Sequence, residues 1–189
     1  CGGNMSPQYY ANEFKRYATY TQWREGNDLY KIACGANSFD YKWTRKFFET
    51  ISGKTCDCAS HQNMVDGYSF HYYCGSTGSA TEYSDLEWYT LLMKAIAIEE
   101  LIIEHRKIMD EFDPNRRIGL ICDEWGTWHP PVKGTNPSWL RQQNTIRDAL
   151  VAALTLDIFN NHSDKLVMAN IAQTVNVLQA MILTDGQRV

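Results

Sequence analysis

The sequence predicts an α/β fold and, within that class, a partial (β/α)8 barrel, the TIM-barrel architecture. Helix-like and strand-like segments alternate strictly along the 189 residues, which is the pattern of parallel strands joined by helical crossovers. Polar and aromatic residues follow the strand-like segments at their carboxyl ends, where barrel enzymes carry functional groups. No glycine-rich nucleotide-binding motif follows any strand, which disfavours a nucleotide-binding sheet. A small doubly wound sheet is the alternative, because four strands suit either architecture.

The first half of the chain contains two helix-like and two strand-like segments. Ser6 suits the N-cap of the first helix and Pro7 its first helical position, and apolar residues then recur at helical spacing. The second helix carries Trp43, Phe47 and Ile51 as its apolar stripe. The predicted order is helix 7–23, strand 29–34, helix 40–51, polar loop 54–63 and strand 64–73.

The second half continues the alternation. A long helix-like segment comes first, and Pro114 closes it. An apolar run over 118–122 has the length and flanks of a strand buried on both faces. Three of the five prolines lie within 129–138, which predicts an irregular loop. The predicted order is helix 85–112, strand 117–122, helix 140–160, strand 166–169 and helix 175–182.

Composition argues against several classes of function. The net charge is −4 and the sequence pI is about 5.7, so the chain lacks the basic character of a nucleic-acid binder. No apolar run reaches the roughly 18 residues of a membrane span. Cys56 and Cys58 are one residue apart with no second pair after them, which does not suit a zinc site. Cys34 and Cys122 fall in apolar runs, and we expect buried, reduced thiols there and hence a reducing compartment.

The segment 118–129, I-G-L-I-C-D-E-W-G-T-W-H, carries the clearest functional pattern. Asp123 and Glu124 follow the apolar run directly, at the strand end where barrel enzymes place catalytic acids. Trp125 and Trp128 frame them, and flat aromatic faces beside a carboxylate suit a sugar. Neighbouring strand residues point to opposite faces, so we interpret Asp123 as structural. The alternative is that these acids cap the next helix or pair with the arginines just upstream.

Three separated motifs support one family. They read D-E-W-G-T-W-H at 123–129, N-I-A-Q-T-V-N-V-L-Q-A-M at 170–181 and C-G-G-N-M-S-P-Q-Y-Y-A at 1–11. Together they resemble glycoside hydrolase family 51, in the same order and over essentially the whole chain. That family consists mainly of retaining α-L-arabinofuranosidases with a (β/α)8 barrel followed by a β-sandwich. The resemblance implies that residues 1–189 are the carboxyl-terminal half of the catalytic domain, roughly strands five to eight with their helices.

The resemblance also implies roles for individual residues. Glu124 matches the family's catalytic nucleophile, at the end of strand seven. Tyr73 matches a tyrosine that hydrogen-bonds the nucleophile, and His71, two residues earlier on the same strand face, matches an active-site histidine. Gln173 matches a glutamine that contacts the arabinose hydroxyls, and Asn170 is expected to support that turn. Each residue also has an alternative interpretation: Tyr73 as a core tyrosine, His71 as a structural histidine and Gln173 as a polar residue at a helix start.

Trp125 and Trp128 have two interpretations. Both lie beside Glu124 and can form walls of a sugar pocket. A large aromatic side chain next to a catalytic strand is as often a packing residue as a substrate contact. The sequence leaves the choice open for each ring.

The implied function is the release of terminal α-L-arabinofuranosyl residues from arabinoxylan- or arabinan-type oligosaccharides with retention of configuration, a step in hemicellulose degradation. The family's acid/base glutamate lies upstream of Cys1, so we expect a fragment, inactive alone, of an active parent. Strands one to four and the β-sandwich are expected to lie outside it. The substrate is then an arabinose-containing glycan, and no metal or cofactor is needed. The family's usual properties imply a cytoplasmic parent that forms homo-oligomers.

Two other functions stay open. The same barrel also serves endoglucanases and xylan-active hydrolases, because a fold does not fix a substrate. A non-catalytic carbohydrate-binding derivative of such a barrel belongs to a different class. The presence of Glu124, His71 and Tyr73 weakens the binding-protein interpretation, since a protein without catalysis has no need of them.

Overall fold

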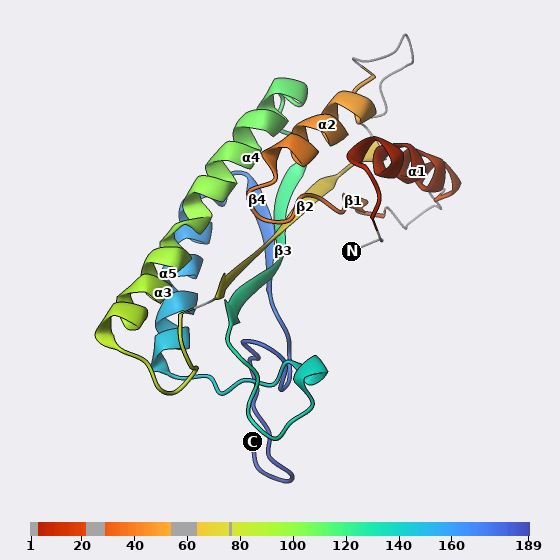
Figure 1. Ribbon diagram of the computed structural model, residues 1–189. Helices are drawn as coiled ribbons and strands as arrows, with labels where there is room; N and C mark the ends of the chain where they lie inside the picture. The colour runs from red at the N-terminus through yellow and green to blue at the C-terminus, as the bar shows by residue number, and fades with distance from the viewer. Residues whose placement is uncertain (1–3, 22–28, 54–63, 76) are drawn as a thin grey trace. The chain divides into compact units, whose positions relative to one another are not determined.

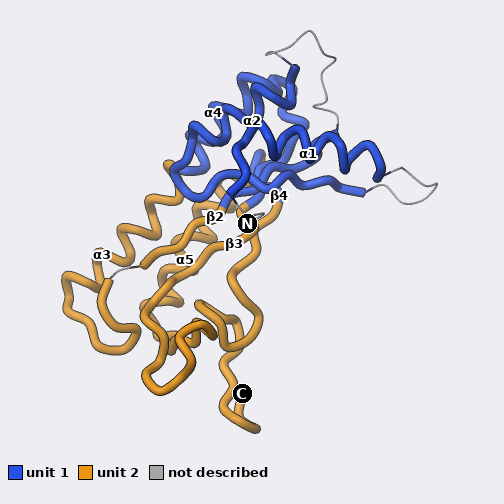
Figure 2. The backbone as a smooth tube through the Cα atoms, turned by 45° about the vertical axis from the view of Figure 1, so that its right-hand side comes forward, with its two compact units in different colours: residues 1–70, 101–121, 165–167 blue, residues 71–100, 122–164, 168–189 orange. Residues whose placement is uncertain are grey.

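The computed structural model describes residues 4–21, 29–53, 64–75 and 77–189. Cys1, Cys56, Cys58 and the predicted loop 54–63 lie outside the described residues. The chain divides into two compact units, coloured separately in Figure 2. Unit 1 comprises residues 1–70, 101–121 and 165–167, and unit 2 comprises residues 71–100, 122–164 and 168–189. Three strands contribute their first parts to unit 1 and their later parts to unit 2.

A four-stranded sheet has the spatial order β1-β2-β3-β4, which is also the order along the chain (Figure 1). The first pair is parallel, with Ile32 opposite Gly67 and Ala33 opposite Tyr68. A doubly wound sheet reverses its strand order at one point, whereas this sheet has no reversal. The α/β class is therefore confirmed, and closure into a barrel stays a prediction. The strands are β1 (Ile32–Ala33), β2 (Gly67–Gly75), β3 (Gly119–Trp128) and β4 (Leu166–Ile171).

Unit 1 contains helices α1 (Pro7–Tyr20) and α2 (Tyr41–Ile51) and most of α4 (Ile98–Phe112). The predicted N-cap of α1 is confirmed, because the Ser6 side chain accepts a hydrogen bond from Tyr9 N at 3.2 Å. Aromatic and aliphatic side chains fill the core, as the stripe on α2 predicts. Its fully buried members include Phe47, Phe48, Ile51, Tyr68, Phe70, Leu101 and Ile102.

Unit 2 contains α3 (Asp85–Ile96), the short 3-10 helix η2 (Pro137–Trp139) and α5 (Ile146–Asn161). Ser84 and Glu87 form a reciprocal capping box at the start of α3. At the start of α5, Asp148 Oδ2 accepts hydrogen bonds from the backbone N of Thr145 at 2.7 Å and from its Oγ1 at 3.1 Å. These caps fix where each helix leaves its preceding loop.

Two helix predictions are wrong. The single helix over 85–112 is two helices, α3 and α4, separated at Ala97, and no glycine or proline in the sequence marks that break. The helix predicted over 175–182 does not exist. Asn176 and Leu178 have φ angles of +59° and +51°, which end any helical run, and Asn176 N bonds Ile182 O at 3.1 Å. The apolar spacing of that segment belongs to a folded loop.

Other boundaries shift by several residues. Strand β3 continues to Trp128, so Asp123 and Glu124 lie inside the strand and not after it. Helix α5 begins at Ile146 instead of residue 140, because Leu140 has a left-handed backbone with φ +52°. The longer β3 carries both acids and both tryptophans of the motif on one regular element.

Candidate active site

The candidate site lies in unit 2, on the later halves of two neighbouring strands. His71 and Tyr73 are two residues apart on β2, so their side chains leave the same face of the strand. Asp123 and Glu124 lie on β3. Because β2 and β3 are hydrogen-bonded neighbours, the sheet itself brings these four side chains together.

The Glu124 carboxylate is the centre of this group. Tyr73 Oη donates a hydrogen bond to Glu124 Oε2 at 3.0 Å. His71 Nδ1 lies 3.6 Å from the same oxygen. The Glu124 side chain is 49% exposed, so it has both a fixed set of neighbours and an open side. A carboxylate with this combination can act on a molecule that approaches from solvent.

Tyr73 and His71 hold protons that suit this role. Burial raises the pKa of Tyr73 well above its ordinary value, and the hydrogen bond to Glu124 raises it further, so the hydroxyl stays a donor. The hydrogen bond that His71 donates to Asp123 raises the pKa of His71, while burial acts in the opposite direction. His71 is therefore protonated up to a higher pH than an ordinary histidine. Two donors then face the Glu124 oxygen.

Asp123 is a residue whose part the sequence interpretation missed. We expected it to lie apart from the site, but its Oδ1 is 3.0 Å from His71 Nε2. The imidazole thus lies between two carboxylates, with one nitrogen toward Asp123 and the other toward Glu124. Alternation along β3 does not exclude this arrangement, because a histidine on the neighbouring strand is long enough to contact both residues. The pair of adjacent acids was the only signal for it.

The two tryptophans have different surroundings. Trp125 is 4% exposed, and its ring meets the Phe159 ring edge-on with centroids 5.3 Å apart. This is the packing arrangement of the two alternatives. Trp128 is 43% exposed, and its ring meets the Tyr73 ring edge-on at 5.2 Å. Trp128 therefore offers an open aromatic surface next to the tyrosine that binds Glu124.

Asn170 and Gln173 belong to the end of β4 and the segment after it, and both are exposed. Ala172 N donates to Trp125 O at 3.0 Å, which aligns this segment with β3 one residue beyond Glu124. The peptide between Ala172 and Gln173 is cis. Since no helix follows Gln173, its interpretation as a helix-start residue is wrong. Direct contact of these two side chains with a sugar stays a prediction.

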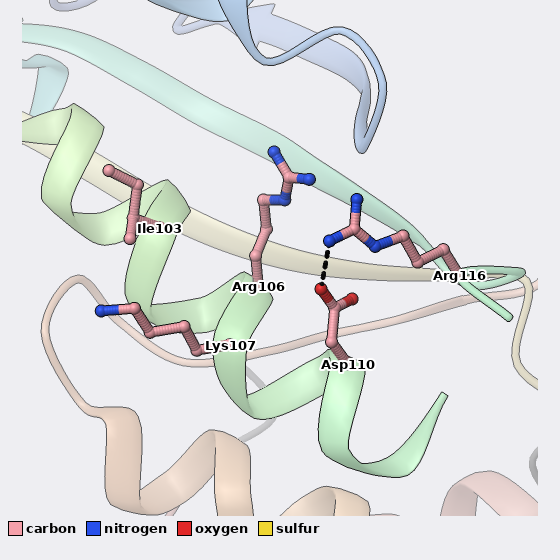
Figure 3. A pocket seen from close by; sticks show the side chains of 5 residues that line it. All are labelled: Ile103, Arg106, Lys107, Asp110 and Arg116. Atoms are coloured by element: carbon pink, nitrogen blue, oxygen red, sulfur yellow. Dashed lines mark hydrogen bonds and ion pairs between the residues drawn. The ribbon is translucent and has the colours of Figure 1, made fainter. Parts of the chain in front are cut away.

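A separate pocket lies in unit 1 and is lined by none of these residues (Figure 3). Its wall consists of Ile103, Arg106, Lys107, Asp110 and Arg116. The Arg116 and Asp110 side chains point toward each other, with Arg116 Nη2 at 2.8 Å from Asp110 Oδ2. Among the described residues, no group of three or more His, Cys, Asp or Glu side chains is arranged to hold a metal ion.

The thiols and the helices bear on two further predictions. Cys74 and Cys122 are free thiols and are buried, Cys122 as predicted, whereas Cys34 is only partly buried. None of the described helices is both long enough and apolar enough to cross a membrane.

Comparisons with known proteins agree with the motifs. A family model for the α-L-arabinofuranosidase C-terminal domain matches residues 123–189. An intracellular exo-α-L-arabinofuranosidase of Bacteroides ovatus is 46% identical over 99% of this chain and 35% of that protein. A probable α-L-arabinofuranosidase C of Aspergillus niger is 30% identical over 96% of this chain and 36% of that protein.

A solved structure extends the agreement to the fold. The GH51 arabinofuranosidase from Xanthomonas axonopodis pv. citri matches 98% of this chain and 37% of its own, with a TM-score of 0.90 and 44% identity. The chain spans about a third of the length of the curated relatives it matches. The resemblance predicted from the motifs is confirmed, and the chain is a relative of the glycoside hydrolase family 51 α-L-arabinofuranosidases.

Proposed function

We propose that this chain supplies the nucleophile side of the active site of a retaining α-L-arabinofuranosidase. The observation that carries the proposal is the pair of donors, Tyr73 and His71, that face the half-exposed Glu124 carboxylate. The similarity to an exo-α-L-arabinofuranosidase over nearly the whole chain supports the same activity. The substrates are oligosaccharides of the arabinoxylan or arabinan type with terminal α-L-arabinofuranosyl residues.

In the proposed mechanism, Glu124 attacks the anomeric carbon and forms a glycosyl-enzyme. A second carboxyl group, about 5–5.5 Å away, protonates the leaving oxygen and later activates the water that releases the sugar. We propose that this acid/base lies in a segment that precedes residue 1, as the family resemblance implies. Tyr73 fixes one Glu124 oxygen, so that the other is free to attack. His71 Nδ1 lies 3.6 Å from the same oxygen that Tyr73 binds and helps to hold the carboxylate in this orientation.

The sugar is held by the remaining predicted residues. We propose that Trp128 packs against the sugar ring, since its face is open beside Tyr73. Gln173 and Asn170 are proposed to bind hydroxyl groups of the arabinofuranosyl ring, as their exposure allows. Trp125 is proposed to support the wall of the pocket from behind. Its ring is buried against Phe159, so we do not expect the ring to contact the sugar.

The proposal extends to the whole protein. Residues 1–189 are proposed to be strands five to eight of a (β/α)8 barrel with their helices, completed by strands one to four and followed by a β-sandwich. The parallel order of the four strands supports this assignment. A cytoplasmic location is supported by the Bacteroides relative, which is named as intracellular. A homo-oligomeric parent is carried over from the resemblance alone.

The test is chemical rescue in the full-length protein that contains this chain. Glu124→Ala should lower the hydrolysis of an aryl α-L-arabinofuranoside by roughly a thousandfold or more. Added azide should then restore turnover and give the arabinofuranosyl azide of inverted configuration, because azide enters on the face that the carboxylate has left. Glu100→Gln, at an exposed position of α4 in unit 2, is the matched control and should leave the rate unchanged.

Each outcome decides a part of the proposal. A Glu124→Ala protein that keeps most of its rate would rule out Glu124 as the nucleophile. Loss of activity without formation of the azide would leave Glu124 only a positioning role. Faster hydrolysis of aryl glucosides or xylosides by the unmodified protein would favour the glucanase or xylan-active alternative. Binding of glycans without any hydrolysis would favour a carbohydrate-binding derivative.

A further inference from the structure

A buried polar network lies in unit 2, just beyond the acids on β3. It comprises Thr127, His129, Gln142, Asp148 and Gln179, and we refer to these five residues as the β3 clamp. Each of them is between 0% and 5% exposed. Buried polar groups are stable only when they are hydrogen-bonded, so a network of this size needs a physical reason.

Asp148 is the centre of the β3 clamp. Its Oδ1 accepts a hydrogen bond from Thr127 Oγ1 at 2.6 Å and lies 2.8 Å from His129 Nε2. Because a carboxylate is only an acceptor, His129 must carry its proton on Nε2. The other oxygen, Oδ2, caps α5 through Thr145. One carboxylate therefore joins the start of α5 to the two residues on either side of Trp128.

Burial alone would raise the pKa of Asp148. Its hydrogen bonds with His129, Thr127 and the backbone of Thr145 outweigh that effect and lower the pKa below the ordinary value. Asp148 is thus ionised at neutral pH and accepts from all of these donors at once.

The two glutamines of the β3 clamp fix the backbone of the same segment. Gln179 Oε1 accepts from Thr127 N at 2.8 Å, and Gln142 Oε1 accepts from His129 N at 2.8 Å. Gln142 Nε2 donates to Thr127 Oγ1 at 3.0 Å. Gly126, with φ +144°, turns the strand just before this segment, a conformation that favours glycine. Side chains therefore make these bonds to Thr127, near the end of β3, and to His129, just after it.

Trp128 lies between the two clamped residues and is the only one of the three that is exposed. Its ring meets Tyr73 edge-on, and Tyr73 donates to Glu124. Contacts thus run without a gap from Asp148 through the backbone at 127–129 to the Trp128 ring, the Tyr73 ring and the Glu124 carboxylate. A small shift at 127–129 would move the ring that supports the tyrosine.

We propose that the β3 clamp is a positioning device for the reaction, and that it acts through Trp128 to hold Tyr73 against Glu124. Its members touch neither the substrate nor the reacting atoms. The inference rests on the proposed function, because it assigns the clamp to the same glycosidase site. It predicts that a substitution in the clamp lowers kcat/KM only while the Trp128 ring is present.

The test is a double-mutant cycle between the β3 clamp and Trp128 in the full-length protein. Thr127→Val removes the hydroxyl at constant shape, whereas Thr127→Ser keeps the hydroxyl and is the matched control. We expect Thr127→Val to lower kcat/KM for an aryl α-L-arabinofuranoside by roughly tenfold, mainly through kcat, and Thr127→Ser to lower it less than about twofold. In a Trp128→Ala background, Thr127→Val should have almost no further effect.

Val151→Ala, one turn after Asp148 on α5 and also buried, measures the effect of destabilisation while every hydrogen-bonding side chain of the clamp is kept. It should lower thermal stability and leave kcat/KM unchanged. If Thr127→Val does not fold, Gln179→Met takes its place in the cycle, because it removes the acceptor for Thr127 N with little change in volume.

A decrease by the same factor in both backgrounds would show that the clamp is merely structural and would overturn the inference. So would a Thr127→Val protein with full activity. Neither result touches the proposed function, which fails separately if Glu124→Ala keeps its rate. A strong effect of Thr127→Val that disappears in Trp128→Ala supports the clamp as a positioning device.

Discussion

At the scale of single residues, the site depends on the contacts of the Glu124 carboxylate with Tyr73 and His71, and on the contact of His71 with Asp123. Tyr73 Oη lies 3.0 Å from Glu124 Oε2, and His71 lies between Glu124 and Asp123. Both donors come from β2 and both acids from β3, so neighbouring strands alone assemble the group. A point substitution of Tyr73 or His71 therefore removes one donor and leaves β2 and β3 in place.

Tyr73→Phe removes the donor and keeps the ring against Trp128. A hydrogen bond to a charged group contributes about 1.5–3 kcal/mol. We therefore expect kcat/KM in the full-length protein to fall roughly ten- to a hundredfold. The control is Tyr89→Phe, at an exposed position of α3. Equal activities of Tyr73→Phe and the unmodified protein in initial-rate assays would contradict the role of this hydroxyl.

The pH dependence reports on His71. Its pKa is raised chiefly by Asp123, so the protonated form persists to a higher pH than in an ordinary histidine. If that proton supports Glu124, activity declines on the alkaline side as His71 loses it. Asp123→Asn should shift this alkaline limb of the kcat/KM profile to lower pH, whereas Asp157→Asn, exposed on α5, should not. An unshifted limb in Asp123→Asn would argue against protonated His71.

At the scale of elements, the loop after β2 depends on a buried arginine of α5. Arg147 is 0% exposed and donates to Thr77 O at 3.2 Å and to Ser79 O at 2.9 Å. Its guanidinium also lies over the Tyr83 ring, 3.8 Å from the centroid. One side chain thus holds Thr77, Ser79 and Tyr83, in the segment that precedes α3.

Arg147→Met fills a similar volume but leaves the buried carbonyl group of Thr77 and the partly buried carbonyl group of Ser79 without this donor. We expect the free energy of unfolding to decrease by about 2–4 kcal/mol. Urea denaturation of the full-length protein measures this decrease, and Lys133→Met, at an exposed loop position, controls for loss of a charge. An unfolding free energy within about 0.5 kcal/mol of the unmodified value would contradict the role of Arg147.

The same scale shows what sequence patterns predict well. The alternation of helices and strands as far as β4, apart from the break at Ala97, and the N-cap at Ser6 depend on local chemistry and were predicted correctly. The helix at 175–182 was not, because left-handed residues at Asn176 and Leu178 fold an apolar segment that has helical spacing. The break at Ala97 likewise has no local marker. Tertiary contacts, absent from any local pattern, decide both places.

The candidate site divides in the same manner. The roles of Glu124, Tyr73 and His71 were predicted from the family resemblance, and the structure brings their side chains together. The contact of Asp123 with His71 depends on the register of β2 against β3, which cannot be predicted from the sequence pattern. The β3 clamp joins residues up to 52 positions apart, such as Thr127 and Gln179. Such long-range polar networks are visible only in three dimensions.

At the scale of the whole molecule, β1 and β4 are the edges of the four-stranded sheet. Val167 and Met168 on β4 are 54% and 42% exposed. Exposed apolar edge strands promote pairing with other chains. The proposed barrel would cover both edges with strands that this chain does not contain.

Residues 1–189 produced alone should therefore self-associate and show no hydrolysis of an aryl α-L-arabinofuranoside. Light scattering coupled to size-exclusion chromatography measures the first property, and an initial-rate assay measures the second. The full-length protein at the same concentration is the control. A monomeric, active 189-residue chain would contradict both the half-barrel assignment and an acid/base group outside it.

The central claim, that Glu124 is the nucleophile of an arabinofuranosidase, is tested most directly by trapping the glycosyl-enzyme. The full-length protein is incubated with a mechanism-based arabinofuranosyl inactivator, and the labelled peptide is identified by mass spectrometry. We predict one label, on Glu124, since attack by the nucleophile forms a covalent bond to the sugar. A label on another carboxylate, such as Asp123, or no label on a protein that hydrolyses arabinofuranosides, would contradict the claim.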